Sequence, residues 1–238
     1  MRLALAAVAL LALLAAAPAD AADRILVGRS VEGRPISAVR VGDPNAGRTA
    51  LVVGQIHGDE PAGRRVAAVL RARKSIAGID LFVIDTVNPD GARRGRRQNA
   101  RGVDLNRNWP VRWKRTASGG RYYGGPKPLS EPESRAVAAF ARRIEPDVSI
   151  WYHQPYGAVL IGARGSFPVQ RRYAELARLP VQRGTGDPLP GTAIRWQNAT
   201  FPGTTAFVVE FGAARPSDAT IERHARAALV VARFGAKR

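Results

Sequence analysis

Cysteine is absent from the 238-residue sequence, so no disulfide bond can contribute to the stability of the fold. Acidic residues are also scarce: 19 aspartates and glutamates stand against 37 lysines and arginines, which gives a formal net charge of +18. Such an excess attracts polyanions, among them nucleic acid, anionic lipid and acidic cell-wall polymers. The alternative is that the arginine content follows the codon usage of the source genome and that these charges are solvated. The sequence contains no nucleic-acid-binding motif, so nucleic acid is the least expected of these partners.

Long hydrophobic runs are missing beyond the N-terminus, where one apolar run extends from Leu3 to Ala17. Arg2 precedes this run, and the small-residue segment 19–21 follows it. The arrangement predicts a secretory signal peptide over residues 1–21, with an uncleaved membrane anchor as the alternative. No later segment approaches the roughly eighteen apolar residues of a membrane span. We therefore expect residues 22–238 to be a secreted catalytic domain, either periplasmic or associated with the cell wall, and not an integral membrane protein.

Alternating strand and helix patterns cover the rest of the sequence and indicate one domain, because no internal repeat or low-complexity linker divides them. Apolar, β-branched runs predict buried strands, and apolar residues at helical spacing predict helices. The expected strands cover residues 48–56, 79–87, 148–154 and 205–212, and the expected helices cover 60–75, 129–146 and 218–235. This alternation is typical of an α/β fold with a largely parallel or mixed sheet.

Two local signals refine this pattern. The residues "NPDG" at 88–91 follow the second strand and predict a loop. At the start of the helix over 129–146, Ser130 is expected to be the N-cap and Glu133 to complete a capping box.

Polar residues at the expected strand ends indicate a site. Ligands of open α/β sheets bind at the carboxyl ends of the strands, where His57, Asn88, His153 and Glu210 lie. His57 and Glu60 are three residues apart in a turn that leads into a helix, so both can reach one metal ion. This spacing alone is weak support, since unrelated proteins carry it by chance. His153 is the candidate third ligand.

A second polar block, "RRQNARGVDLNRNWP", covers residues 96–110. The planar guanidinium of arginine binds a carboxylate through two parallel hydrogen bonds or stabilises a developing oxyanion. Asn106 and Arg107 are poorly explained as part of a solvated basic loop, because the apolar "VDL" leads directly into them. The third histidine, His224, lies in the middle of a helix among charged residues and is expected at the surface or in packing.

Five segments taken in order resemble the zinc carboxypeptidase family, and most closely its compact bacterial branch of murein peptide amidases. They are "HGDE", "RRQNARGVDLNRNWP", "YYGGPKPLSEPES", "WYHQP" and "VVEFG", which together extend over residues 51–212. The block "R-x-N-x-x-G-V-D-L-N-R-N-W" is the most specific of them. The resemblance implies a single-domain, three-layer α/β/α fold around a central mixed sheet.

The resemblance also implies roles for individual residues. His57, Glu60 and His153 match the three ligands of one catalytic Zn²⁺ per chain. Arg97 matches the residue that polarises the scissile carbonyl. Asn106 and Arg107 match the pair that binds the terminal carboxylate of the substrate, and Glu210 matches the catalytic carboxylate.

The sequence departs from the family in the region before Glu210, where digestive members carry a tyrosine on a mobile loop. No tyrosine lies between Gly184 and Glu210, and neither Tyr156 nor Trp196 is assigned its role. Residues 187–205 are expected to form one wall of the specificity pocket. Arg195 in this wall is a candidate partner for an acidic group of the substrate, although a surface position explains it equally well.

Three functions follow from these features. The first is a secreted zinc peptidase that cleaves next to a C-terminal residue with a free carboxylate, with peptidoglycan stem peptides and their γ-D-Glu–diamino acid bond as the expected substrate. The second is a zinc-dependent deacylase of the aspartoacylase or succinylglutamate desuccinylase type, which shares the H-x-x-E and "DLNR" elements. The third is a non-catalytic module that binds cell wall through its basic surface. The complete ligand set together with Arg97 and Glu210 favours an enzyme over the third.

Overall fold

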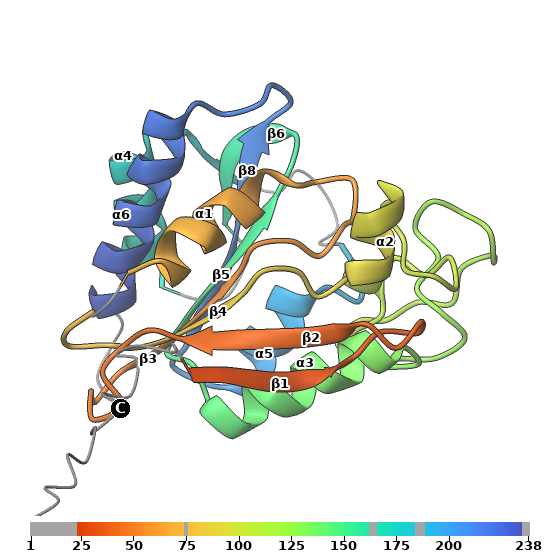
Figure 1. The fold of residues 1–238 in the computed structure, drawn as a ribbon. Helices are drawn as coiled ribbons and strands as arrows, with labels where there is room; N and C mark the ends of the chain where they lie inside the picture. Colours follow the sequence, from red (N-terminus) through yellow and green to blue (C-terminus); the bar gives the residue numbers. More distant parts are fainter. Residues whose placement is uncertain (1–22, 74–75, 162–165, 184–188, 235–238) are drawn as a thin grey trace, which may run out of the picture.

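The computed structural model describes residues 23–73, 76–161, 166–183 and 189–234 (Figure 1). The expected signal peptide over residues 1–21 lies outside the described residues, as does Gly235, the expected end of the last helix. No helix within the described ranges is long and apolar enough to cross a membrane.

Eight strands in the described residues form one mixed sheet, and helices cover both faces of it. The strands are β1 (Asp23–Arg29), β2 (Pro35–Arg40), β3 (Thr49–Val53), β4 (Asp80–Ile84), β5 (Val148–His153), β6 (Tyr156–Ile161), β7 (Val181–Arg183) and β8 (Thr205–Gly212). The helices are α1 (Ala62–Arg71), α2 (Pro89–Arg94), α3 (Pro132–Ile144), α4 (Phe167–Ala177), α5 (Ala193–Thr200) and α6 (Asp218–Phe234), with a short 3₁₀ turn, η1, at Leu105–Arg107.

The centre of the sheet is parallel. Its strand order is β1-β2-β4-β3-β5-β8-β6-β7, and the neighbours β4, β3, β5 and β8 run in the same direction. Parallel strands that are covered on both faces need apolar residues on both sides, which explains their uninterrupted apolar runs. Because these four strands are parallel, their carboxyl ends meet at one edge of the sheet.

Two hydrophobic cores lie on the two faces of this sheet. One core joins the sheet to α1, α4 and α6, and the other joins it to α3 and α5 (Figure 1). The expected three-layer α/β/α arrangement around a mixed sheet is therefore confirmed.

Two local predictions are wrong. Residues 88–91 are not a plain loop: α2 begins at Pro89, and the Asn88 side chain caps it by accepting a hydrogen bond from Gly91 N–H at 2.9 Å. Ser130 does not cap α3, whose N-cap is Glu131 without a side-chain cap hydrogen bond. The Ser130 hydroxyl instead accepts a hydrogen bond from the Asn108 side chain and donates one to the Glu131 carboxylate. The Glu133 carboxylate accepts a hydrogen bond from the backbone N–H of Val31.

Two glycines allow the His57 loop to pack closely against its neighbours. A Cβ atom on Gly58 would lie 2.1 Å from the backbone carbon of Gly91 in α2. A Cβ atom on Gly63 would lie 2.2 Å from the Cβ of Tyr152 in β5. Side chains at these positions would therefore displace the loop between β3 and α1 from the edge of the sheet.

Candidate active site

His57, Glu60 and His153 converge at the carboxyl edge of the sheet. His57 and Glu60 lie in the loop between β3 and α1, and His153 is the last residue of β5. Glu60 bridges the two histidines, with one oxygen 2.8 Å from His57 Nδ1 and the other 2.8 Å from His153 Nδ1. The two Nδ1 atoms are 3.1 Å apart, and all three side chains are buried.

This donor set fits a zinc ion. Two imidazole nitrogens and a carboxylate oxygen are ordinary zinc ligands, and bonds of about 2.0–2.1 Å in a tetrahedron separate ligand atoms by roughly 3.3 Å. The ligand atoms of His57, Glu60 and His153 lie within 4.8 Å of one another, with the closest pairs near that separation. Two imidazole lone pairs directed at one point repel each other unless a cation lies between them, which favours a metal over a simple hydrogen-bonded cluster.

Asp104 fixes the orientation of His57, although the sequence analysis assigned it no role. Its Oδ1 lies 3.0 Å from His57 Nε2, so the other ring nitrogen, Nδ1, is directed towards Glu60 and His153. A carboxylate behind a metal-binding histidine fixes the tautomer of the ring and raises its basicity. Asp104 is fully buried, and despite this burial its hydrogen bond to His57 lowers its pKa. A signal was present in the sequence, namely a charged residue between the apolar Val103 and Leu105.

The pKa values of the histidines and of Glu60 reflect this arrangement. Burial lowers the pKa of His57, but its hydrogen bonds to Asp104 and Glu60 outweigh burial, and the net change is a rise. Burial raises the pKa of Glu60, but hydrogen bonds from His153 and His57 hold it below its ordinary value. The pKa of His153 is lowered, mainly by burial. Glu60 is thus an ionised carboxylate between two imidazoles.

Arg97 lies beside this cluster with its guanidinium directed into it. Its Nε donates to Asp104 Oδ2 at 3.0 Å, and its Nη1 donates to Glu60 Oε1 at 3.1 Å. The backbone of Arg97 is held in place as well, because the Asn88 side chain donates a hydrogen bond to the Arg97 carbonyl at 3.1 Å. The strand-end residue Asn88 therefore supports the site from behind.

Asn106 and Arg107 lie on the other side of the His153 ring. Asn106 Nδ2 is 3.4 Å from His153 Nε2, and Asn106 Oδ1 accepts a hydrogen bond from Ala193 N–H at 3.0 Å. Arg107 is only 9% exposed, and its Nη1 donates to the Asn106 carbonyl at 2.7 Å. Burial lowers the pKa of Arg107 below that of a free guanidinium. A buried arginine with few acidic partners is suited to receive an anion.

Tyr122 contacts the guanidinium groups of both arginines, Arg97 and Arg107. Its ring centre lies 5.4 Å from the guanidinium carbon of Arg97 and 5.3 Å from that of Arg107, and half of the residue is exposed. Stacking on an aromatic ring holds a guanidinium by a cation–π interaction. No motif spacing would have identified this contact, because Tyr122 comes from the long segment between η1 and α3.

Glu210 completes the site from β8. It pairs in register with His153 in β5, and it is 5% exposed. Burial, followed by the negative charge of Glu60, raises its pKa to about 7. Its nearest described hydrogen-bond donor is the backbone N–H of Tyr156, at 3.5 Å. A carboxyl group with a pKa near neutrality is suited to proton transfer.

Comparison with known proteins agrees with this geometry. The family model described as zinc carboxypeptidase matches residues 7–177. Murein peptide amidase A from Escherichia coli (strain K12) is 31% identical over 182 residues, which cover 71% of this chain and 74% of that protein. The chain belongs to the zinc carboxypeptidase family. It is accordingly a zinc-dependent hydrolase.

Solved structures of zinc carboxypeptidases share the fold. Murein-tripeptide amidase from Escherichia coli O157 has a TM-score of 0.70 and 26% identity, with 90% of this chain and 93% of that chain covered. Carboxypeptidase A from Helicoverpa armigera has a TM-score of 0.73 at 19% identity, with 91% and 69% covered, and shows the fold alone.

Trp196, Tyr156 and Arg195 of this zinc carboxypeptidase lie at different distances from the site. Trp196 is buried and packs against Trp109, with ring centres 4.9 Å apart, so it belongs to the core. Tyr156 is 69% exposed, and its backbone adjoins Glu210. Arg195 lies half-buried in α5, two residues from the Ala193 N–H that binds Asn106. Ala193 of the segment 189–205 thus contacts Asn106, the specificity-pocket wall stays a prediction, and residues 187–188 lie outside the described residues.

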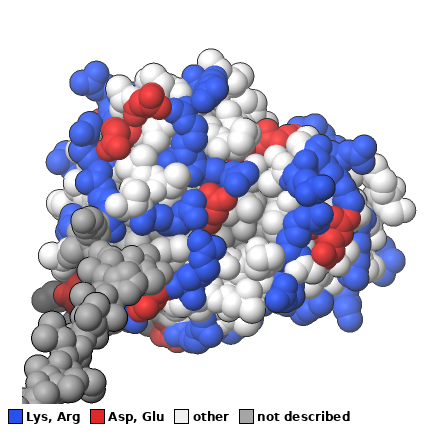
Figure 2. Space-filling view, in the orientation of Figure 1, with Lys and Arg blue, Asp and Glu red and all other residues white. Residues whose placement is uncertain are grey.

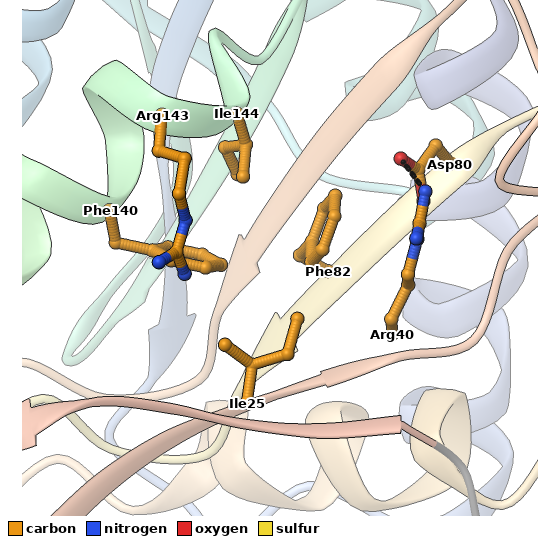
Figure 3. Close-up of a pocket in the computed structure, with 7 residues that line it drawn as sticks. All are labelled: Ile25, Arg40, Asp80, Phe82, Phe140, Arg143 and Ile144. Carbon is orange, nitrogen blue, oxygen red and sulfur yellow. Dashed lines mark hydrogen bonds and ion pairs between the residues drawn. The ribbon is translucent and has the colours of Figure 1, made fainter.

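A separate cavity of about 440 Å³ lies away from these residues, at the amino end of β4 (Figure 3). Phe82, Phe140, Ile25 and Ile144 point into it, and Arg40 pairs with Asp80 at its rim. None of the site residues lines this cavity. Arg143 on α3 also lines this cavity, with its guanidinium carbon 5.1 Å from the ring centre of Phe140.

Proposed function

We propose that the protein is an exported zinc peptidase that hydrolyses the amide bond before a C-terminal residue with a free carboxylate. The observation that carries this proposal is the position of a buried guanidinium, that of Arg107, and a buried amide, that of Asn106, beside His153. The expected substrates are peptidoglycan stem peptides, cleaved at the γ-D-Glu–diamino acid bond. Two findings support this choice: murein peptide amidase A is 31% identical to this chain, and the N-terminal pattern over residues 1–21 indicates export.

In this proposal His57, Glu60 and His153 hold zinc, which when bound lowers the pKa of a water molecule and polarises a carbonyl group. Asn106 and Arg107 bind the terminal carboxylate and thereby place the preceding amide bond beside the ligands. Arg195, in the wall formed by α5, is the candidate for pairing with an acidic side chain of the substrate.

Glu210 moves the proton in this reaction. Its carboxylate accepts a proton from the attacking water and delivers it to the nitrogen of the leaving amine. Arg97 stabilises the negative charge that develops on the carbonyl oxygen, since its guanidinium is already directed into the cluster.

The test compares three substrates with the zinc-loaded protein, and products are identified by mass. L-Ala-γ-D-Glu-diaminopimelate should release free diaminopimelate, while the same peptide with an amidated C-terminus should react far more slowly. Release of the carboxylic acid from N-acyl amino acids, without cleavage of the tripeptide, would support the deacylase hypothesis instead. Glu210→Gln should lower kcat by roughly 10²–10⁴-fold and leave the zinc content unchanged, and retained activity would remove Glu210 from the mechanism.

A further inference from the structure

A groove of about 730 Å³ runs between α1 and the segment 213–216 that follows β8. Four arginines line it: Arg64, Arg65 and Arg71 from α1, and Arg215 from the segment after β8. Two aspartates, Asp59 and Asp85, also contribute to the lining. Lysine and arginine side chains gather around α1 on this face of the molecule, with few acidic side chains between them (Figure 2).

The groove begins at the metal-binding residues. Asp59 and Pro61, on either side of Glu60, line it, and so does Gln154, which follows His153. Gln154 spans the boundary: its backbone N–H donates to Glu60 Oε2 at 3.3 Å, and its side-chain oxygen accepts from Ala62 N–H at 2.9 Å. The groove therefore adjoins the loop that carries Glu60.

The positive charge of the groove is only partly matched within the described residues. Arg64 and Arg71 share one carboxylate, that of Asp85, with contacts of 2.7 and 3.1 Å. Arg65 pairs with Asp218, an exposed residue at the start of α6. Arg215 is exposed and makes no hydrogen bond or ion pair with any residue that the structure describes. With the exposed Asp59 included, four guanidiniums stand against three carboxylates, which leaves an excess of one positive charge.

Glu60, whose neighbours Asp59 and Pro61 line the groove, and Asn106 of the carboxylate-binding pair contact different nitrogens of His153. The Nδ1 atom of the His153 ring faces Glu60, and its Nε2 atom faces Asn106. Since the two nitrogens of an imidazole point in nearly opposite directions, Glu60 lies on one side of the ring and Asn106 on the other. A substrate held by its C-terminal carboxylate at Arg107 therefore extends its acyl portion towards the groove.

We propose that this arginine groove binds an anionic acyl portion of the substrate. The ligand class is a short peptide with a free carboxylate on the acyl side of the scissile bond, and Arg215 with Arg64 provides the main attraction. This inference rests on the proposed function for the direction of the substrate. The groove adds to that function a preference for substrates that carry a negative charge on the acyl side of the scissile bond.

The experiment measures binding by calorimetry, independently of turnover. The probes are L-Ala-D-Glu and L-Ala-D-isoglutamine, which differ only in that an α-carboxylate is replaced by an amide. The full-length zinc-loaded protein should bind the acid about fivefold more tightly than the amide, and salt should reduce this preference. Arg215→Glu should abolish the preference, and Arg64→Gln should reduce it.

The matched control is Arg143→Glu, the same change of charge at the separate cavity on α3, which should leave the preference intact. Equal binding of the two probes by the unaltered protein, or a preference that survives Arg215→Glu, would overturn the proposal. Failure of the proposed function gives a different result. In that case no peptide with a free C-terminus would be cleaved, while the Arg215-dependent preference in binding would persist.

Discussion

Two buried histidine clusters lie on opposite sides of one strand of this protein, in contrasting surroundings. The first, the site cluster, consists of His57, Glu60, Asp104 and His153. The second, the tyrosine cluster, consists of Tyr152, Tyr173 and His224, whose polar atoms form a chain of hydrogen bonds of 2.8 and 2.9 Å. Tyr152 and His153 are consecutive in β5, so their side chains point to opposite faces of the sheet.

The clusters differ in what surrounds the imidazole. The histidines of the site cluster contact two ionised carboxylates, and Arg97 adjoins them. The His224 ring lies against the rings of Phe211, Tyr152 and Tyr173, and its Nδ1 atom is 2.9 Å from the Tyr173 hydroxyl. Burial lowers the pKa of His224 to about 4, so it stays neutral. In the site cluster, the ring nitrogens of His57 and His153 face a shared carboxylate and each other, which is the arrangement of a metal site. The ring nitrogen of His224 faces a tyrosine hydroxyl, and this histidine contributes to core packing.

The largest expected difference between the clusters is in zinc binding. His153→Gln removes one of three proposed ligands, and we expect zinc affinity to fall by more than the roughly 10–100-fold that loss of an outer partner costs. The matched variant His224→Gln keeps a hydrogen-bond acceptor for Tyr173 and should retain zinc in full. Metal content after dialysis, measured by atomic emission, checks both variants. Full zinc occupancy in His153→Gln would exclude His153 as a ligand.

A smaller effect is expected from the partners behind the histidines. Asp104→Asn removes the charge that orients His57, so zinc affinity should fall by about 10–100-fold. Tyr173→Phe removes the hydrogen bonds to His224 and Tyr152 and should cost about 2 kcal/mol of unfolding free energy without changing zinc affinity. Competition with a zinc chelator and chemical denaturation separate the two effects. Equal zinc affinities in Asp104→Asn and the unaltered protein would contradict the orienting role.

The sequence predicted the central part of the molecule better than its margins. The strands β3, β4, β5 and β8 were all expected, because strands buried on both faces carry long apolar runs. The outer strands β1, β2, β6 and β7 were missed, since a strand at the margin needs only a partial apolar pattern. Helices α4 and α5 were missed as well.

In the site, the spacing of His57 and Glu60, the strand-end position of His153 and the family resemblance together predicted one cluster, and in the structure the three side chains converge. The contacts of Asp104 and Tyr122 could not be predicted, because each depends on how the long segment between α2 and α3 folds back onto the loop after β3. The capping box at Ser130 failed for a related reason. Asn108, which is distant in sequence, competes for the Ser130 hydroxyl. Local patterns do not include such tertiary partners.

The most gradual effect, spread over more than two pH units, is the pH dependence of stability that the tyrosine cluster imposes. The pKa of His224 is about 4 in the folded protein, against about 6.5 in an unfolded chain, so between these values the unfolded state binds the extra proton. Stability due to His224 is therefore complete above pH 6.5 and falls as the pH decreases towards 4, by about 3 kcal/mol in total at roughly 1.4 kcal/mol per pH unit.

His224→Gln has no proton to gain, so its unfolding free energy should fall less steeply over this range than that of the unaltered protein. The comparison subtracts the contributions of His57, His153 and the carboxylates, which both proteins share. Urea denaturation at half-unit steps from pH 7 to 4.5 measures the difference. Parallel curves for the two proteins would show that His224 has the same pKa in the folded and unfolded states, and the contrast between the two histidine clusters would then no longer hold.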